Sequence, residues 1–381
     1  MSVCTIAPGR VNLIGEHTDY TGGFVLPMAI SLVTSATIMP TNDGLYHFDS
    51  ELFSETRTMS PDDRSGKANT WSDYPVGVLR ELQKLGIEPP LFALTLHGNV
   101  PRGAGLSSSA SVEMATAMAL LRHSGMTLKS EEIVALCRRA ENVYVGSPCG
   151  IMDQFVIAYA KRGHALLLNT RDLAYQHLPL NRGTLAECVI VVANSGVRHS
   201  IAGGSYGLRR RELEAGQDVL LAQYPKLRDL GDASLSQLAS CESMMQPESY
   251  RRCRHVISEN SRTLRASAAM IAGDPLWLGA LMTQAHRSER DDFECSIAEI
   301  DFLVSTAIEL PGCYGARLTG GGFGGCTVNL VKAAEAETFS SSLSVAYRER
   351  WACDLSIYVC EAADGAMARA EAEQKVMEVQ D

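Results

Sequence analysis

The chain has 381 residues, of which 46% are hydrophobic and 20% are charged, values close to the average for globular proteins. This composition excludes a disordered, collagenous or low-complexity protein. The 44 acidic residues outnumber the 34 basic ones and give a net charge of −10. We expect no nucleic-acid partner, because a phosphate backbone attracts a basic surface. We also expect no membrane partner, because no stretch approaches the ~20 apolar residues that span a bilayer.

The cysteines and the N-terminus indicate a cytoplasmic protein. The 11 cysteines are odd in number, are irregularly spaced and form no Cys-x-x-Cys pair. This pattern disfavours a zinc ribbon, a redox dithiol or a disulfide framework. The first ten residues lack the basic and apolar segments of a secretory signal. We therefore expect reduced, mostly buried thiols in the cytoplasm.

The first half of the sequence alternates strand-like and helix-like segments. Residues 24–39 are rich in β-branched and apolar side chains, and residues 91–96 alternate apolar side chains with Thr, so both segments are predicted strands. A Gly/Ser-rich turn over 103–109 leads into a predicted helix that ends near His123, with Gly125 as its stop.

Two further helices are predicted in the first half, one with Ser130 as its N-cap and a short one over 149–160. The buried face of the helix after Ser130 is expected to carry the residues that recur at helical spacing, which are Ile133, Leu136, Cys137, Ala140 and Tyr144.

The second half is predicted to form its own domain, which gives an N-terminal domain over 1–183 and a C-terminal domain over 184–381. A fully apolar strand over 189–193 comes first. The elements predicted after it are helices over 206–223, 252–272, 275–290 and 298–310, strands over 315–319 and 325–331, a helix over 333–350 and a strand over 355–360. The Ala/Glu-rich segment from 361 onward fits either a last helix or a frayed end.

The densest group of polar side chains lies between residues 7 and 23. Arg10, Asn12, Glu16, His17 and Asp19 fall within ten positions and are interrupted by glycines. A sugar needs several donors and acceptors at fixed angles, and these side chains supply them over a short arc. The rival interpretation is a solvated turn, in which Asp, Asn and Gly are also common.

Two glycine-rich segments follow. The first, over 98–111, opens a predicted helix, and its free N–H groups and helix dipole favour an anion such as phosphate. Its hydroxyls, Ser107 to Ser109, suit phosphate oxygens or a hard cation, although the lysine of a P-loop is missing. The second, over 318–326, has five glycines within six positions, which indicates either a close backbone approach or a tight hairpin.

In order and spacing these segments resemble the signatures of the GHMP small-molecule kinase superfamily. The sequence RVNLIGEHTDYTGGFVLP, residues 10–27, looks like the specific signature of the galactokinase family. GAGLSSSAS and LTGGGFGGC are similar to the second and third motifs of the superfamily, and PCGIMDQ, residues 148–154, adds a fourth. The resemblance extends across essentially the whole chain.

The resemblance implies an α+β fold with a ribosomal-protein-S5 domain-2-like N-terminal domain and a ferredoxin-like C-terminal domain, with the active site in the cleft between them. The implied reaction transfers the γ-phosphoryl group of ATP to the C1 hydroxyl of α-D-galactose, with Mg²⁺ as cofactor. The competing functions are a kinase for another sugar, such as N-acetylgalactosamine, and a non-catalytic galactose sensor. We expect a monomer.

Two catalytic residues follow from the resemblance. Asp153, on a predicted helix with mostly apolar neighbours, would be the base or would position the hydroxyl, since phosphoryl transfer depends mainly on alignment and electrostatics. Arg10 would pair with it, because an unpaired charge among apolar side chains is costly.

The resemblance assigns Mg²⁺ to Ser109 and Glu141. Spacing supports Glu141 independently, since it lies four residues after Cys137 on the apolar stripe, where a carboxylate is unusual without a partner. The alternative is a salt bridge to Arg138 or Arg139.

The remaining site residues are assigned by the resemblance as two sets. The sugar-binding set is Glu16, His17, Thr18, Asp19, Gly150, Asp153 and Tyr206. The ATP-binding set is Gly103, Ala104, Gly105, Leu106, Ser107, Ser108 and Ser109. The sequence departs from the family pattern at Thr21, where Asn or Asp is usual, and at Ser205, where an acidic residue is common.

Overall fold

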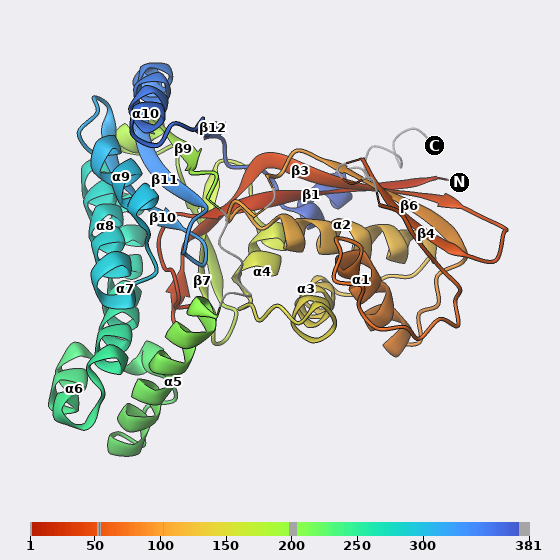
Figure 1. Cartoon of the computed structure of the whole chain (residues 1–381), viewed down its shortest axis with the longest axis horizontal. Coiled ribbons are helices and arrows are strands. Elements are labelled where there is room, and N and C mark those ends of the chain that lie inside the picture. Colours follow the sequence, from red (N-terminus) through yellow and green to blue (C-terminus); the bar gives the residue numbers. More distant parts are fainter. Residues whose placement is uncertain (1, 52, 54, 102, 198–203, 373–381) are drawn as a thin grey trace.

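The computed structural model describes residues 2–51, 53, 55–101, 103–197 and 204–372. The molecule is elongated, and the two halves of the sequence form neighbouring units that join along the middle (Figure 1). Within the described residues, no helix is long and apolar enough to cross a membrane.

A mixed five-stranded sheet forms the N-terminal half. In spatial order its strands are β1 (Val3–Asn12), β3 (Pro27–Pro40), β6 (Phe92–Gly98), β4 (Tyr46–Ser50) and β5 (Arg57–Met59). The helices that lie on one side of this sheet are α1 (Asp73–Lys84), α2 (Ser108–His123), α3 (Ser130–Arg139) and α4 (Met152–Tyr159) (Figure 1). Helix α2 packs directly on β1 and β3, so the start of α2 lies beside the end of the first strand.

An antiparallel four-stranded sheet forms the C-terminal half. In spatial order its strands are β10 (Cys313–Thr319), β11 (Cys326–Lys332), β9 (Cys188–Asn194) and β12 (Ser356–Cys360). The accompanying helices are α5 (Ser205–Gln223), α6 (Leu235–Ser240), α7 (Pro247–Ala272), α8 (Pro275–Ser288), α9 (Ala298–Ala307) and α10 (Ala336–Trp351). Helix α8 packs on β10, which is the strand that leads into the third motif.

A small three-stranded sheet connects the two halves. Its strands are β2 (Phe24–Val25), β7 (His164–Asn169) and β8 (Tyr175–Pro179). Strand β7 contacts β3 in the N-terminal half, whereas β2 and β8 contact α7 in the C-terminal half. The prediction from sequence did not include β7 or β8.

The helix boundaries follow from capping chemistry. Helix α8 begins after Asp274, whose Oδ1 accepts a hydrogen bond from Trp277 N at 3.0 Å. Ser130 was predicted to be the N-cap of α3, and this is wrong, because Lys129 occupies the N-cap and Ser130 is the first helical residue. Lys129 N donates to Glu132 Oε2 at 2.8 Å, so a carboxylate three residues on supplies the cap that the Ser130 hydroxyl was expected to give.

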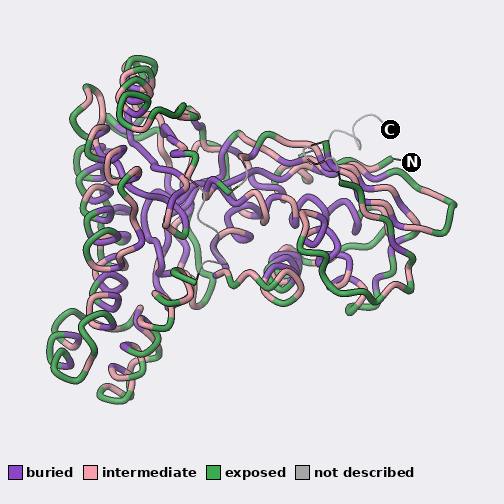
Figure 2. Tube along the Cα trace, viewed as in Figure 1, coloured by how far each residue is buried: buried purple, intermediate pink, exposed green. Residues whose placement is uncertain are grey.

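One apolar cluster joins the halves. It includes Val11 on β1, Met28 on β3, Met282 on α8 and Val328 on β11, all fully buried. Figure 2 shows many buried segments where the two halves meet. The two sheets are therefore fixed against each other by a shared core, and groups from both halves can contribute to one site.

The segment after β12 returns to the N-terminal half. Ala362 forms a bridge with Ile30 on β3, and Gly365 N donates to Ala160 O at 2.8 Å. Residues 366–372 are helical, and Ala366 is fully buried against the N-terminal core. Of the two interpretations of this segment, the structure shows a helix over these residues.

Candidate active site

Arg10 and Asp153 form the centre of the site. Arg10 Nε donates to Asp153 Oδ1 at 2.7 Å and Arg10 Nη2 donates to Asp153 Oδ2 at 2.8 Å, while Nη1 donates to the carbonyl of Gly105 at 2.6 Å. Burial alone would lower the pKa of Arg10, but the carboxylates of Asp153 and Glu16 outweigh it and raise that pKa. The guanidinium is therefore a fixed positive charge beside the Gly/Ser-rich segment over 98–111, which we call the phosphate loop.

The pair is assembled by two backbone irregularities. Strand β1 has a bulge between Pro8 and Arg10, and Arg10 N donates to the carbonyl of Leu106 at 3.1 Å. Ser107, the N-cap of α2, has a left-handed backbone with φ of 55°, and its hydroxyl donates to Asp153 Oδ2. Ser107 was predicted to bind phosphate, and the structure directs its hydroxyl to the Asp153 carboxylate.

A cavity of about 860 Å³ lies beside the phosphate loop. Gly103, Ser108 and Ser109 line one wall. Phe53 and Trp71 also line the cavity, and their rings stack with centroids 5.3 Å apart. These two aromatic residues could not be identified from the sequence, because neither lies in a motif.

The other members of the predicted ATP-binding set have backbone or packing roles. Ala104 and Leu106 are buried in the apolar cluster that joins the halves. Gly105 has φ of +74°, and a Cβ there would lie 3.0 Å from the carbonyl of Thr319 in the third motif. A Cβ on Gly320, which has φ of +93°, would lie 3.2 Å from the Cα of Gly105. The second and third motifs therefore require glycine because their backbones touch each other.

Glu141 lies on the buried face of a π-helical turn over residues 140–145 that continues α3. Its Oε2 accepts from Gln154 Nε2 at 2.7 Å and from Cys149 Sγ at 3.5 Å, and the Ser109 hydroxyl lies close enough to favour the ionised carboxylate and lower its pKa. Burial, together with the nearby Asp153, raises the pKa of Glu141 to about 7. Ser109 and Glu141, predicted to share a metal, therefore lie near each other.

Arg139, one of the two alternative partners of Glu141, pairs with another carboxylate. Arg139 Nε donates to Glu81 on α1 at 2.9 Å, and none of the hydrogen bonds described for Glu141 comes from an arginine. Gln154 Nε2 also lies 3.3 Å from Oε2 of Glu113, a second fully buried carboxyl group. The salt bridge that was the alternative to a metal is thus absent from the described contacts of Glu141.

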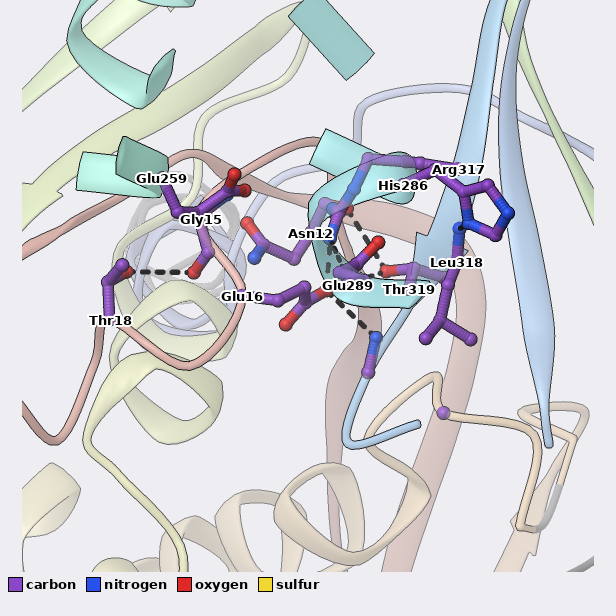
Figure 3. Close-up of polar contacts among 12 residues, drawn as sticks. Asn12, Gly15, Glu16, Thr18, Glu259, His286, Glu289, Arg317, Leu318 and Thr319 are labelled. Atoms are coloured by element: carbon purple, nitrogen blue, oxygen red, sulfur yellow. Dashed lines mark hydrogen bonds and ion pairs between the residues drawn. The ribbon is translucent and has the colours of Figure 1, made fainter. Parts of the chain in front are cut away.

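Glu16 contacts the third motif rather than only the loop that carries it. Its Oε1 accepts from Gly320 N at 2.8 Å and from the Thr319 hydroxyl at 3.2 Å, and Arg317 Nη1 lies 3.5 Å away (Figure 3). The side chain of Glu16 is buried. Its other oxygen points away from this group of donors in Figure 3.

His17 is held edge-on and face-on by aromatic rings. Its ring stacks on Phe293 with centroids 3.9 Å apart, and its Nδ1 lies 3.0 Å from the Tyr20 hydroxyl. Burial lowers the pKa of His17 well below its usual value, so the ring is neutral. Its buried Nε2 has no hydrogen-bond partner among the described residues, which leaves one polar atom for a ligand.

Asp19, Gly150 and Tyr206 lie near the same point. A Cβ on Gly150 would lie 1.7 Å from Asp19 Oδ2, so only glycine leaves room for that carboxylate. Burial, with Asp153 and Glu16 nearby, raises the pKa of Asp19 to about 7. The ring of Tyr206, on α5, has its centroid 6.1 Å from that of His17.

Thr18 differs from the other predicted sugar-binding residues. Its hydroxyl lies 2.9 Å from the carbonyl of Gly15 and 2.7 Å from that of Phe24, and it is fully buried. Its side chain therefore stabilises the turn that presents Glu16 and His17.

Three family models match the chain. They are described as GHMP kinases N terminal domain, over residues 73–161, Galactokinase galactose-binding signature, over residues 2–40, and GHMP kinases C terminal, over residues 266–348. The matched ranges include Arg10, Glu16, Asp153 and the third motif, which are the groups that the contacts described above bring together.

Relatives match along nearly the whole chain. A galactokinase from Roseiflexus is 42% identical over 365 residues, which cover 94% of this chain and 91% of that protein. The human galactokinase is 40% identical over 371 residues, which cover 94% of this chain and 90% of that protein. Both alignments span the N-terminal and C-terminal halves.

Solved structures give the same result. A Lactococcus lactis galactokinase complexed with galactose has a TM-score of 0.90 and 31% identity, over 96% of this chain and 94% of that one. The Methanococcus jannaschii mevalonate kinase, with a TM-score of 0.70 and 19% identity over 96% of this chain and 98% of that one, shares the fold. The predicted two-domain α+β fold is confirmed, and the chain belongs to the galactokinase family of the GHMP kinases.

Proposed function

We propose that this protein transfers the γ-phosphoryl group of ATP to the C1 hydroxyl of α-D-galactose, giving α-D-galactose 1-phosphate and ADP. One observation carries the proposal: the carboxylate of Asp153 is bonded both to Arg10, from the galactose signature, and to Ser107, from the phosphate loop. The sugar segment and the phosphate segment thus meet at a single acidic group, as transfer between the two substrates requires.

The sugar would bind on the side of Glu16, His17 and Asp19. The second oxygen of Glu16, the unpartnered Nε2 of His17 and the Asp19 carboxylate supply acceptors and a donor for several hydroxyl groups. The galactose-binding signature over residues 2–40 and the relatives named galactokinase support galactose as that sugar. Gly150 and Tyr206 would complete the wall of the pocket.

ATP would bind with its phosphates at the start of α2. The free N–H groups and the dipole of that helix favour an anion, and Ser108 and Ser109 face the cavity beside it. The base and ribose would then enter that cavity, whose stacked pair of Phe53 and Trp71 offers an aromatic surface.

In the reaction, Asp153 would hold the C1 hydroxyl in line with the γ-phosphorus and accept its proton as the new O–P bond forms, while the bond from the γ-phosphorus to the β–γ bridging oxygen breaks and ADP leaves. Arg10 keeps this carboxylate in one orientation through two hydrogen bonds and supplies positive charge near the transferring group. Most of the rate enhancement would come from this alignment and from the fixed charges, because phosphoryl transfer needs little covalent help from the protein.

Mg²⁺ fits the groups around Ser109 and Glu141. Glu141 is a buried carboxylate with no cationic partner among its described hydrogen bonds, and the Ser109 hydroxyl is near enough to affect its pKa. Magnesium prefers such hard oxygen ligands and keeps several waters, so two protein groups suffice. When bound, the ion would neutralise charge on the phosphate oxygens of ATP. Ser109 and Glu141 would hold it at the N-terminal end of α2, and Gln154 would orient Glu141 through its hydrogen bond.

The test is ADP release by the purified protein with a panel of sugars, including galactose, N-acetylgalactosamine and glucose, in the presence of Mg²⁺. We expect rapid ADP formation that depends on galactose. Turnover of a different sugar would overturn the substrate, and sugar binding without turnover of any sugar would indicate a sensor.

We also propose a cytoplasmic monomer. All 11 cysteines are free in the structure, five of them at exposed or half-buried positions in strands or loops, as expected for a reducing compartment. Size-exclusion chromatography with light scattering tests the monomer, and a mass near 41.2 kDa is expected.

A further inference from the structure

The Glu16 carboxylate is held by residues that lie far away in the sequence. Arg317, Thr319 and Gly320, at the end of β10, direct three donor groups toward Glu16 Oε1 from the C-terminal half (Figure 3). We call these three residues the Glu16 cradle. The closest contact is the backbone N–H of Gly320, at 2.8 Å, which no side-chain substitution removes.

The cradle is itself anchored on both sides. Arg317 is fully buried, and its Nη2 donates to Glu289 Oε1 at 2.6 Å while its Nη1 donates to the carbonyl of Asn12 at 3.1 Å. The Thr319 hydroxyl lies 3.0 Å from the same carbonyl, so its one proton is shared between Asn12 O and Glu16 Oε1. Asn12 ends β1, so the cradle joins the last residue of the first strand to the strand before the third motif.

The burial of Arg317 costs free energy that its contacts must offset. Burying a charge is expensive, and a salt bridge to Glu289 alone would often be replaced by apolar packing without loss of stability. Arg317 has a second acidic partner, because its Nη1 lies 3.5 Å from Glu16 Oε1. Its positive charge attracts the Glu16 carboxylate, which already accepts the backbone N–H of Gly320.

We propose that the Glu16 cradle orients Glu16 for the sugar, which makes Arg317 and Thr319 positioning residues that set galactose affinity. The donors occupy Oε1 and so direct Oε2 toward the sugar side, away from the cradle. A carboxylate fixed before the sugar arrives loses little rotational freedom on binding, and this gain appears as affinity. The proposal rests on the proposed function, since it assumes that Glu16 binds the sugar.

The proposal also explains the position of the third motif. The glycine-rich turn touches the phosphate loop at Gly105, so a disturbance of the whole turn would affect ATP. The side chains of Arg317 and Thr319 point instead to Glu16 and Asn12. A change confined to these side chains is therefore expected to affect the sugar and to leave ATP unaffected.

The experiment compares Thr319→Val with Thr319→Ser in the full-length protein. Valine has the shape of threonine but lacks the hydroxyl, so galactose binding measured by calorimetry is expected to weaken about tenfold, as for loss of a hydrogen bond to a charged group. Serine keeps the hydroxyl and should restore most of the affinity. The KM for ATP should stay within twofold of the parent value in both variants.

Thr327→Val is the matched control. Thr327 is a fully buried threonine on the adjacent strand β11, opposite Leu318, and its hydroxyl accepts from Asn329. Its loss should leave galactose affinity unchanged. Two results would show a general effect on folding and overturn the proposal. One is an equal loss of galactose affinity in Thr319→Val and Thr327→Val. The other is a rise of the KM for ATP in Thr319→Val by the same factor as its loss of galactose affinity.

The second measurement is a double-mutant cycle for galactose binding. Thr319→Val should weaken binding much less in a Glu16→Gln background than in the parent, because the cradle acts through Glu16. If Thr319→Val weakens galactose binding by the same factor in both backgrounds, the proposal is overturned.

A third variant tests Arg317. The double substitution Arg317→Gln with Glu289→Gln keeps a hydrogen-bonding pair without buried charge and should also weaken galactose binding. Unchanged binding would exclude Arg317 as a positioning residue.

Failure of the proposed function is a separate outcome. If the parent protein turns over a different sugar, the substrate is wrong, and the same variants and cycle are measured with that sugar. If the parent binds galactose but the cycle is additive, the substrate stands and the cradle does not position Glu16.

Discussion

Arg10 donates two hydrogen bonds to Asp153, one to each carboxylate oxygen, although the residues are 143 positions apart in the sequence. This two-point contact fixes the plane of the carboxylate, which a single hydrogen bond or a lysine would not do. Asp153 is on α4 and Arg10 is on β1, so the contact also sets the distance between a helix and a strand. The pair therefore behaves as one unit in our first prediction.

Asp153→Asn should lower kcat by ~10²–10⁴, which is the usual loss when a positioned acid–base group is removed. Galactose should still bind, because Glu16, His17 and Asp19 are unchanged. Arg10→Ala should cause a comparable loss, and the double variant should be hardly worse than the worse single one, because residues that act as a unit are not additive.

Steady-state kinetics and galactose calorimetry on the three variants measure these effects. The exposed ion pair between Arg348 and Asp354 supplies the control, since Asp354→Asn should leave kcat unchanged. Additive losses would mean that Arg10 and Asp153 act independently, and a fully active Asp153→Asn protein would remove the proposed mechanism.

Removal of the Glu141 carboxylate should raise the Mg²⁺ concentration that gives the half-maximal rate. Glu141→Gln keeps the size of the side chain and loses the negative charge, so we expect a rise of about tenfold or more together with a lower kcat. Ser109→Ala should shift the Mg²⁺ requirement in the same direction by a smaller factor, because it removes a neutral ligand.

Mg²⁺ titrations of the initial rate measure this requirement at saturating ATP and galactose. Glu81→Gln is the matched control, since Glu81 is also a buried glutamate but pairs with Arg139 outside the site. An unchanged Mg²⁺ requirement in Glu141→Gln would assign Glu141 a structural role only.

Asp19 should make the sugar-free protein less stable as the pH rises. Its pKa is about 7 in the folded protein, against 3.8 for an exposed aspartate, because burial and the neighbouring Asp153 and Glu16 disfavour the ionised form. The folded state thus binds more protons than the unfolded state between these two pKa values, so this group lowers the free energy of unfolding progressively from about pH 4 to pH 7.

Asp19→Asn removes this penalty. Urea unfolding of the parent and the variant at about pH 5 and about pH 8 should show a larger gain in stability at the higher pH, with each unit of pKa shift corresponding to ~1.4 kcal/mol as an upper limit. The variant should also lose galactose affinity. A gain that is equal at the two pH values would indicate that the Asp19 carboxyl titrates normally.

Much of the fold could be predicted because its signals are local. Helix α2 ends at His123, as its small-residue pattern and the following glycine indicate, and β10 and β11 fall within two residues of the predicted strands. The contacts between the motifs could not be predicted. Ser107 bonds to Asp153, and Glu16 bonds to residues some 300 positions later, because both contacts depend on how separate elements pack.

The missed parts of the site share another property. Phe293 stacks on His17, and Trp71 lines the large cavity, yet each is an ordinary aromatic residue in its own sequence context. An aromatic residue in a helix or turn is far more often part of the core than of a ligand site. Only the folded structure separates these two from the other aromatic residues of the chain.

Trp71 provides the last prediction, because it distinguishes the nucleotide cavity from the sugar side. If the base of ATP enters the cavity beside Phe53 and Trp71, Trp71→Ala should raise the KM for ATP about tenfold through loss of aromatic contact area, with galactose affinity unchanged. Trp71→Phe should retain most of the ATP affinity. Binding of ATP should also change the tryptophan fluorescence of the parent, and this change should be lost in Trp71→Phe although Trp277 and Trp351 remain. A normal KM for ATP in Trp71→Ala, together with a retained fluorescence change in Trp71→Phe, would place the nucleotide base outside this cavity.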